Sequence, residues 1–82
     1  SRTVHAHGVY EGNIADGLSA IQSRHPGLDL GSYPYYRSGG VGGGVALVAK
    51  GTEWAEVEEA ARAMAALLRE AGGEAVEGEP TG

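Results

Sequence analysis

Apolar residues recur with two periods along this chain, and each change of period marks a change of predicted structure. Residues from Thr3 to Val9 alternate between two faces, which predicts a strand that carries His5 and His7 on the same face. The next apolar residues follow at helical spacing, at Ile14, Leu18 and Ile21. We therefore expect a helix after the strand, capped by Asn13 and ended just before Pro26.

The second strand, predicted from Leu28 to Tyr36, contains Pro34 within its length. Proline has no amide hydrogen to give to a strand ladder, so we expect this strand at an edge of its sheet. The glycine-rich stretch SGGVGGG, residues 38–44, then predicts a turn that leads to a short apolar strand at Val45–Ala49.

A long amphipathic segment follows, and Gly51 and Thr52 are expected to cap it. Its apolar residues step by three or four positions, at Trp54, Val57, Ala61, Met64 and Leu68. We expect this stripe to face the sheet, and Gly72 to follow the last helical turn. A short last strand is predicted at Glu74–Glu77.

These elements follow the order strand, helix, strand, strand, helix, strand. The order predicts an α+β fold of the ferredoxin-like βαββαβ type, a split sandwich in which a four-stranded antiparallel sheet carries two helices on one face. This arrangement puts the second strand at an edge, in agreement with the position of Pro34. We expect one domain over residues 1–78 and a flexible tail over residues 79–82.

Composition narrows the classes of function. The formal net charge is −5 and the six basic residues are scattered, which makes nucleic acid and anionic membranes poor partners. The chain has no cysteine, which excludes a disulfide scaffold, a thiolate metal site and a cysteine nucleophile. No apolar run reaches the length of a membrane-spanning helix, and we expect a cytoplasmic domain.

The expected open face of the sheet, with its second-strand edge, carries a candidate interface. The side chains of Tyr33 and Tyr35 are expected on one face of the second strand, and that of Tyr36 on the opposite face. His5 and His7 lie about 7 Å apart by strand rise, but no third protein ligand accompanies them, so no metal site is predicted. Tyrosine suits an interface because it supplies contact area and a hydrogen-bonding tip.

Two other segments are candidates for ligand sites. The glycines of residues 39–44 lead into a strand, and no Lys-Ser or Lys-Thr follows them, which favours a hairpin turn over a phosphate loop. Glu11, Gly12 and Asn13 join the first strand to the first helix, where Glu11 either orients a ligand or favours the helix N-terminus. No catalytic residue and no cofactor are predicted for this domain, because no grouping of catalytic side chains stands out.

Three segments resemble the CinA-type (competence/damage-inducible protein A) molybdopterin-binding proteins. They are GVYEGNIADGLSAI at residues 8–21, HPGLDLGSYPYYR at residues 25–37, and the closing strand and helix at residues 45–68. The resemblance is to the small domain that follows the α/β domain of that family. It implies a non-catalytic accessory, interdomain or dimerisation domain whose partner is the parent's α/β domain or another copy. Molybdopterin or a nucleotide would bind elsewhere in such a parent.

An alternative interpretation belongs to another class. Residues 10–15, YEGNIA, resemble the first strand–helix turn of ACT-type regulatory domains, which share this fold and bind amino acids near that turn. Glu11, Gly12 and Asn13 would then form the ligand turn. The proline of the ACT-type pattern is absent here, and the GSYP stretch at residues 31–34 is not an ACT feature.

Overall fold

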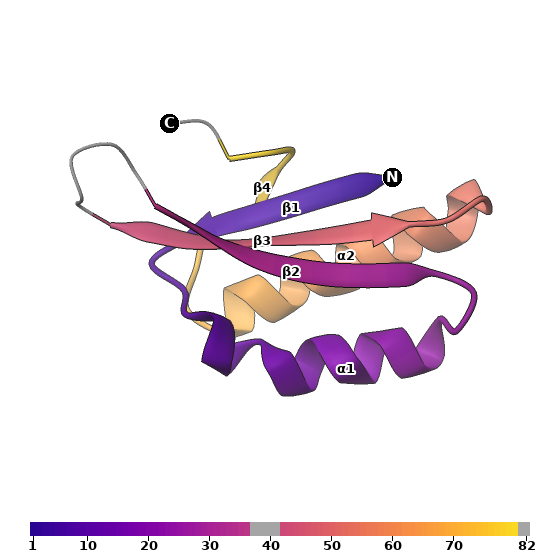
Figure 1. The fold of residues 1–82 in the computed structure, drawn as a ribbon, viewed down its shortest axis with the longest axis horizontal. Helices are drawn as coiled ribbons and strands as arrows, with labels where there is room; N and C mark the ends of the chain where they lie inside the picture. The colour runs from indigo at the N-terminus through magenta and orange to yellow at the C-terminus, as the bar shows by residue number, and fades with distance from the viewer. Residues whose placement is uncertain (37–41, 81–82) are drawn as a thin grey trace.

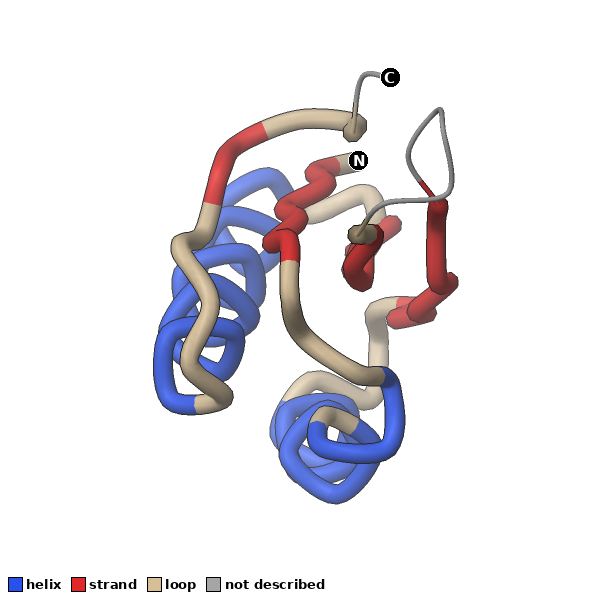
Figure 2. The backbone as a smooth tube through the Cα atoms, turned by 90° about the vertical axis from the view of Figure 1, so that its left-hand side faces the viewer, coloured by secondary structure: helices blue, strands red, loops and turns tan. Residues whose placement is uncertain are grey.

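The computed structural model describes residues 1–36 and 42–80, so most of the predicted turn at residues 38–44 lies outside the described residues. The elements in chain order are β1 (Arg2–His7), the 3-10 turn η1 (Glu11–Asn13), α1 (Ala15–Arg24), β2 (Asp29–Tyr36), β3 (Gly43–Lys50), α2 (Trp54–Glu70) and β4 (Val76–Glu77). The strands form one antiparallel sheet in the order β2-β3-β1-β4. Figures 1 and 2 show both helices on one face of this sheet, which confirms the predicted ferredoxin-like split sandwich.

The position of β2 at the edge of the sheet confirms the prediction made from Pro34. Among the described strands β2 pairs with β3 alone, and Pro34 lies opposite Val45 in that pairing. An edge strand tolerates proline because one of its sides needs no amide donor. The other edge, β4, is shorter than predicted and pairs only Val76 and Glu77 with β1.

The core lies between the sheet and the two helices. The helix-facing residues of β1 and β3 and the apolar stripe of α2 are buried there; they include Val4, Ala6, Val45, Leu47, Ala49, Val57, Ala61, Met64 and Leu68. Ile14 and Ile21 are buried beside them, and Leu18 packs against the same cluster. The predicted stripe is therefore confirmed over its last four members.

Trp54 was wrongly placed in this core, since its side chain is 61% exposed. Trp54 is the first residue of α2, and Figure 1 shows that this end of the helix projects past the strands it would have to pack against. The indole ring instead lies beside the guanidinium of Arg2, whose Cζ is 5.8 Å from the ring centroid. This contact is a cation–π interaction at the surface.

Both predicted helix caps were wrong. Asn13 belongs to η1, the N-cap of α1 is Ile14, and no side chain caps that end. Backbone hydrogen bonds precede the helix instead. The Asn13 N–H donates to the Tyr10 carbonyl and the Ile14 N–H donates to the Glu11 carbonyl, each at 3.0 Å. At α2 the N-cap is Glu53 rather than Gly51 or Thr52, again with no side-chain hydrogen bond.

The predicted helix ends are correct. Helix α1 stops at Arg24, before Pro26, and Gly72 has a positive φ of 95° directly after the C-cap Ala71 of α2. Within the described ranges, neither helix is long and apolar enough to cross a membrane.

Candidate functional site

The face of the sheet opposite the helices, here called the open face, collects four of the five residues of the predicted interface. Strand register aligns Tyr33, Ala46 and His5 in one row across β2, β3 and β1. The next row holds Tyr35, Gly44 and His7. Directly paired residues of an antiparallel ladder share a face, so these two rows lie side by side on the open face.

Three rings of these rows form a cluster. The ring centroids of His5, His7 and Tyr35 lie 5.6 to 5.9 Å apart, and each pair is arranged edge to face. The Tyr35 hydroxyl lies 2.7 Å from Nδ1 of His7, so the tyrosine side chain reaches across β3 to β1. Gly44 makes this possible, because a Cβ at that position would lie only 2.8 Å from the same hydroxyl.

His5 is buried, although it was expected to lie on an open surface. Its side chain is covered by the chain that follows β4, and the residue is only 6% exposed. Nδ1 of His5 lies 2.7 Å from the Gly78 carbonyl oxygen, and a carbonyl only accepts, so Nδ1 carries the proton and donates. This bond fixes the orientation of the His5 ring and does not involve Nε2, the other ring nitrogen.

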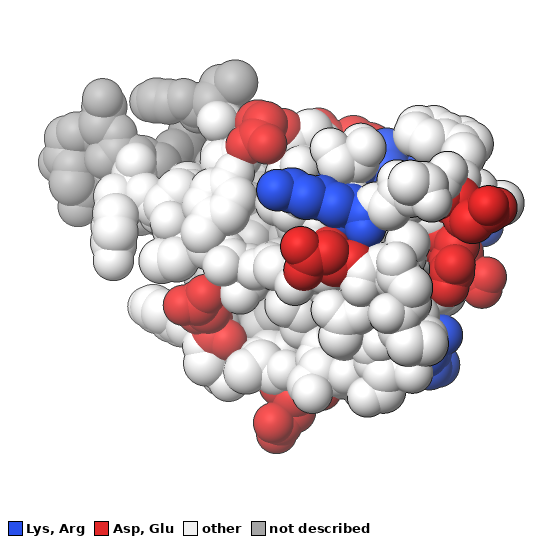
Figure 3. All heavy atoms as spheres, turned by 45° about the vertical axis from the view of Figure 1, so that its right-hand side comes forward, with Lys and Arg blue, Asp and Glu red and all other residues white. Residues whose placement is uncertain are grey.

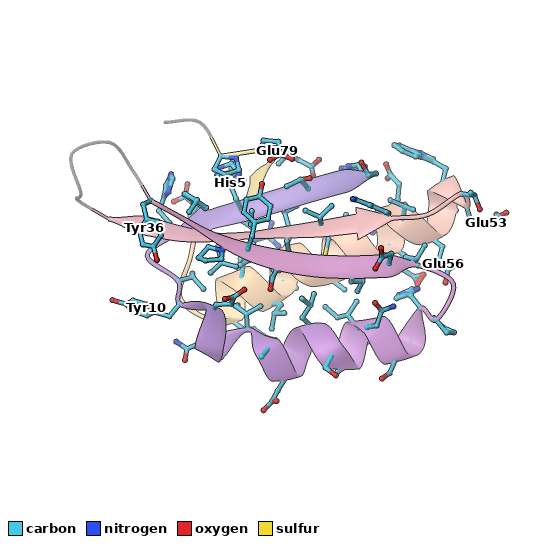
Figure 4. The ribbon with its side chains drawn as sticks, in the orientation of Figure 1. His5, Tyr10, Tyr36, Glu53, Glu56 and Glu79 are labelled. Carbon is cyan, nitrogen blue, oxygen red and sulfur yellow. The ribbon has the colours of Figure 1, made fainter. Side chains whose placement is uncertain are left out.

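Glu79 extends this cover across the sheet. Its carboxylate accepts a hydrogen bond from the Thr3 hydroxyl of β1 at 3.3 Å and another from the Tyr33 hydroxyl of β2. The hydrogen bond to Glu79 raises the pKa of Tyr33 above its ordinary value, and desolvation and the nearby charge add to the effect. Figure 4 shows Glu79 on the same side of the sheet as His5.

A groove of about 410 Å³ opens at the end of the sheet where β2 and β3 approach their connection. The turn after β1 and the ends of β2 and β3 line it, and its aromatic residues are Tyr10, Tyr35 and Tyr36. Tyr10 and Tyr36 are 77% and 84% exposed, and Figure 4 shows both at this end of the molecule. We call this site the Tyr10–Tyr36 groove.

Tyr36 was predicted as an interface residue, but Tyr10 was missed. Tyr10 lies in the connection between β1 and η1, where no hydrophobic period assigns a face to a side chain. Its only signal in the sequence is that it is an aromatic residue in a short connection.

The predicted ligand turn has a structural contact of its own. Glu11, Gly12 and Asn13 form η1 and are exposed, and the Glu11 carboxylate accepts a hydrogen bond of 2.9 Å from the Ser32 hydroxyl. This bond ties η1 to β2. The ACT-type interpretation receives no support from this geometry.

Charge on the described surface is mixed. Arg2 pairs with Glu58 and Glu77, and Figure 3 shows the basic side chains of one face interspersed with acidic and neutral ones. Across residues 1–36 and 42–80, no group of three or more His, Asp or Glu side chains is placed to hold a metal ion. That the domain binds neither nucleic acid nor metal stays a prediction.

A protein-family model described as "FAD synthase, middle domain" matches residues 1–76. The chain belongs to this family. Membership of the FAD synthase middle-domain family agrees with the expected small accessory domain of a larger protein, but it does not show a CinA-type domain. No curated protein and no solved structure matches the chain.

Proposed function

We propose that this chain is the non-catalytic middle domain of an FAD synthase and that it holds neighbouring parts of that protein together. The observation that carries the proposal is the family match, which spans residues 1–76 of the 82. The polar contacts of three charged side chains are internal and hold the domain's own elements together. Glu11 binds Ser32, His25 binds Glu56, and Arg2 binds Glu58.

The Tyr10–Tyr36 groove is the surface that we propose for docking a neighbouring domain of the same parent. The predicted interface included His5 and Tyr33, and the chain's own tail bonds to Nδ1 of His5 and to the Tyr33 hydroxyl. Tyr10 and Tyr36 are instead exposed at one end of the sheet, beside a groove that can receive a partner's side chains. Large exposed aromatic residues at a concave site are typical of a docking surface.

A more specific form of the proposal takes up the resemblance to CinA-type proteins. In that form a molybdopterin- or nucleotide-binding α/β domain precedes this one, and the cofactor binds outside residues 1–82. The coding sequence upstream of Ser1 tests it directly, since an α/β domain should be encoded there. In this form of the proposal the domain also self-associates through the Tyr10–Tyr36 groove, and the protein is cytoplasmic.

The docking role is tested in the full-length parent with the double variant Tyr10→Ala/Tyr36→Ala. The matched control is Tyr10→Phe/Tyr36→Phe, which keeps both rings and removes only the hydroxyls. We expect the alanine variant to weaken assembly in sedimentation and to lower the rate of FAD formation, while circular dichroism of the domain is unchanged. Unchanged assembly and unchanged FAD formation would contradict the docking role.

The non-catalytic role has its own test. The isolated 82-residue chain is expected to form no FAD from FMN and ATP under conditions in which the full-length parent does. Steady formation of FAD by the isolated chain would overturn this part of the proposal.

A further inference from the structure

The chain reverses onto the open face immediately after β4. Gly78 has a positive φ of 97°, a conformation that glycine adopts without strain, and its N–H donates to the Thr3 carbonyl oxygen at 2.7 Å. Its own carbonyl accepts the Nδ1–H of His5. Both backbone groups of Gly78 are therefore bonded to β1 rather than to water.

Glu79 then spans the sheet from one side of β3 to the other. Its two carboxylate oxygens accept from the hydroxyls of Thr3 on β1 and Tyr33 on β2, and these strands flank β3. Hydrogen bonds to an ionised acceptor are stronger than bonds between neutral groups. Four hydrogen bonds thus join two consecutive residues, Gly78 and Glu79, to β1 and β2, and three of them are made by side chains of the open face.

Burial along this part of the open face is uneven, because Glu79 is exposed whereas residues of the sheet beside it are covered. Ala46 lies in the row between Tyr33 and His5 on the open face, yet it is fully buried, with 0% of its surface exposed. Pro80 is half-buried. Ala46 is thus covered in a row whose other members, His5 and Tyr33, have large rings.

We propose that the open face is the docking site of the segment that leaves the domain, Gly78–Pro80, and that this docking fixes the direction in which the chain enters the part of the protein that follows. The inference rests on the proposed function, in which this domain is a middle one. The family match ends at residue 76, so the docked segment lies just beyond the matched part. The flexible tail expected over residues 79–82 stays a prediction, and the proposal departs from it at Glu79 and Pro80.

Amide exchange and nitrogen-15 relaxation of the 82-residue chain test the docking itself. The test variants are Glu79→Ala, which removes the carboxylate, and Thr3→Val/Tyr33→Phe, which removes both hydroxyls and keeps the side-chain bulk. The control is Glu74→Ala, an exposed acid of the connection between α2 and β4. We expect the Gly78 amide to exchange about tenfold faster in both test variants, as the loss of hydrogen bonds to a charged group implies.

In the same experiment, exchange of core amides such as Leu68 should be unchanged, and Glu74→Ala should match the wild type. A wild-type Glu79 amide with the relaxation of a free tail, or a Gly78 amide unaffected by both test variants, would overturn the inference.

The effect on direction is measured in the full-length parent. A pair of spin labels, one in this domain and one in the part that follows, should give a narrow distance distribution that Glu79→Ala broadens. A broad wild-type distribution, or no broadening in Glu79→Ala, would refute the orienting role. The Tyr10→Ala/Tyr36→Ala result is independent of this outcome, so the inference and the proposed function fail separately.

Discussion

A side chain at Gly44 of β3 would overlap the main-chain carbonyl oxygen of Ala6 on β1. A clash with backbone cannot be relieved by rotation of a neighbouring side chain. The absence of a Cβ at this position therefore lets β1 and β3 approach each other and leaves room for a side chain to cross the sheet above them.

Gly44→Ala is expected to destabilise the domain by about 1–3 kcal/mol, the usual cost of inserting a methyl group into a closely packed site. Urea denaturation measures this change. The control is Gly31→Ala on β2, since a Cβ there meets nothing within 4 Å. Equal stability of the two variants would contradict the assigned role of Gly44.

Leu68→Ala is expected to lower the free energy of unfolding by about 2–5 kcal/mol, because Leu68 is fully buried in the core. Trp54→Ala removes a larger side chain from the same helix but should cost only about 0.5–1 kcal/mol, the scale of an exposed cation–π contact. Chemical denaturation of both variants tests the comparison. A greater loss for Trp54→Ala than for Leu68→Ala would show that the apolar stripe of α2 is misassigned.

The Tyr33–Glu79 contact predicts a dependence of stability on alkaline pH. The folded state raises the pKa of Tyr33 above its unfolded value of 10.0, so the contribution of this group is fully present below pH 10.0 and is lost as the pH rises through the folded pKa. Tyrosinate absorbance, assigned to Tyr33 by difference from Tyr33→Phe, follows the titration. Glu79→Ala should lower the pKa of Tyr33, and an unchanged pKa would contradict the contact.

Gln22→Ala is expected to cost about 1–3 kcal/mol, because it removes three hydrogen bonds to backbone groups in the turn between α1 and β2. The Gln22 amide nitrogen donates to the carbonyls of His25 and Leu28 at 3.1 and 2.8 Å, and its oxygen accepts from the Leu30 N–H at 3.1 Å. Thermal unfolding measures the loss. The exposed neighbour Ser23, changed to alanine, is the control, and an equal loss for both would refute this assignment.

The element order and the edge position of β2 were predictable because they follow from local rules. Pro34 limits its strand to an edge of the sheet in any fold. The spacing of Val57, Ala61 and Leu68 defines one face of a helix without reference to the rest of the chain. Trp54 follows the same spacing, but periodicity does not indicate where the sheet ends. Its exposure depends on the relative lengths of α2 and the strands.

The candidate site was predictable only in part, for the same reason. Strand phase puts His5, Tyr33 and Tyr35 on one face, and the structure agrees. The cover over that face depends on contacts such as that between Thr3 and Glu79, which are separated by 76 residues. A short tail of glycine, glutamate and proline has no periodic signal that would predict such a contact.

The two edge strands of the sheet are poorly suited to pair with a strand from another molecule. Strand β4 extends over only two residues, and β2 carries at Pro34 a nitrogen that can donate no hydrogen bond. A long regular edge invites strand-by-strand aggregation between molecules, and a short edge or a proline opposes it. Both edges of this sheet therefore oppose strand-by-strand association between molecules.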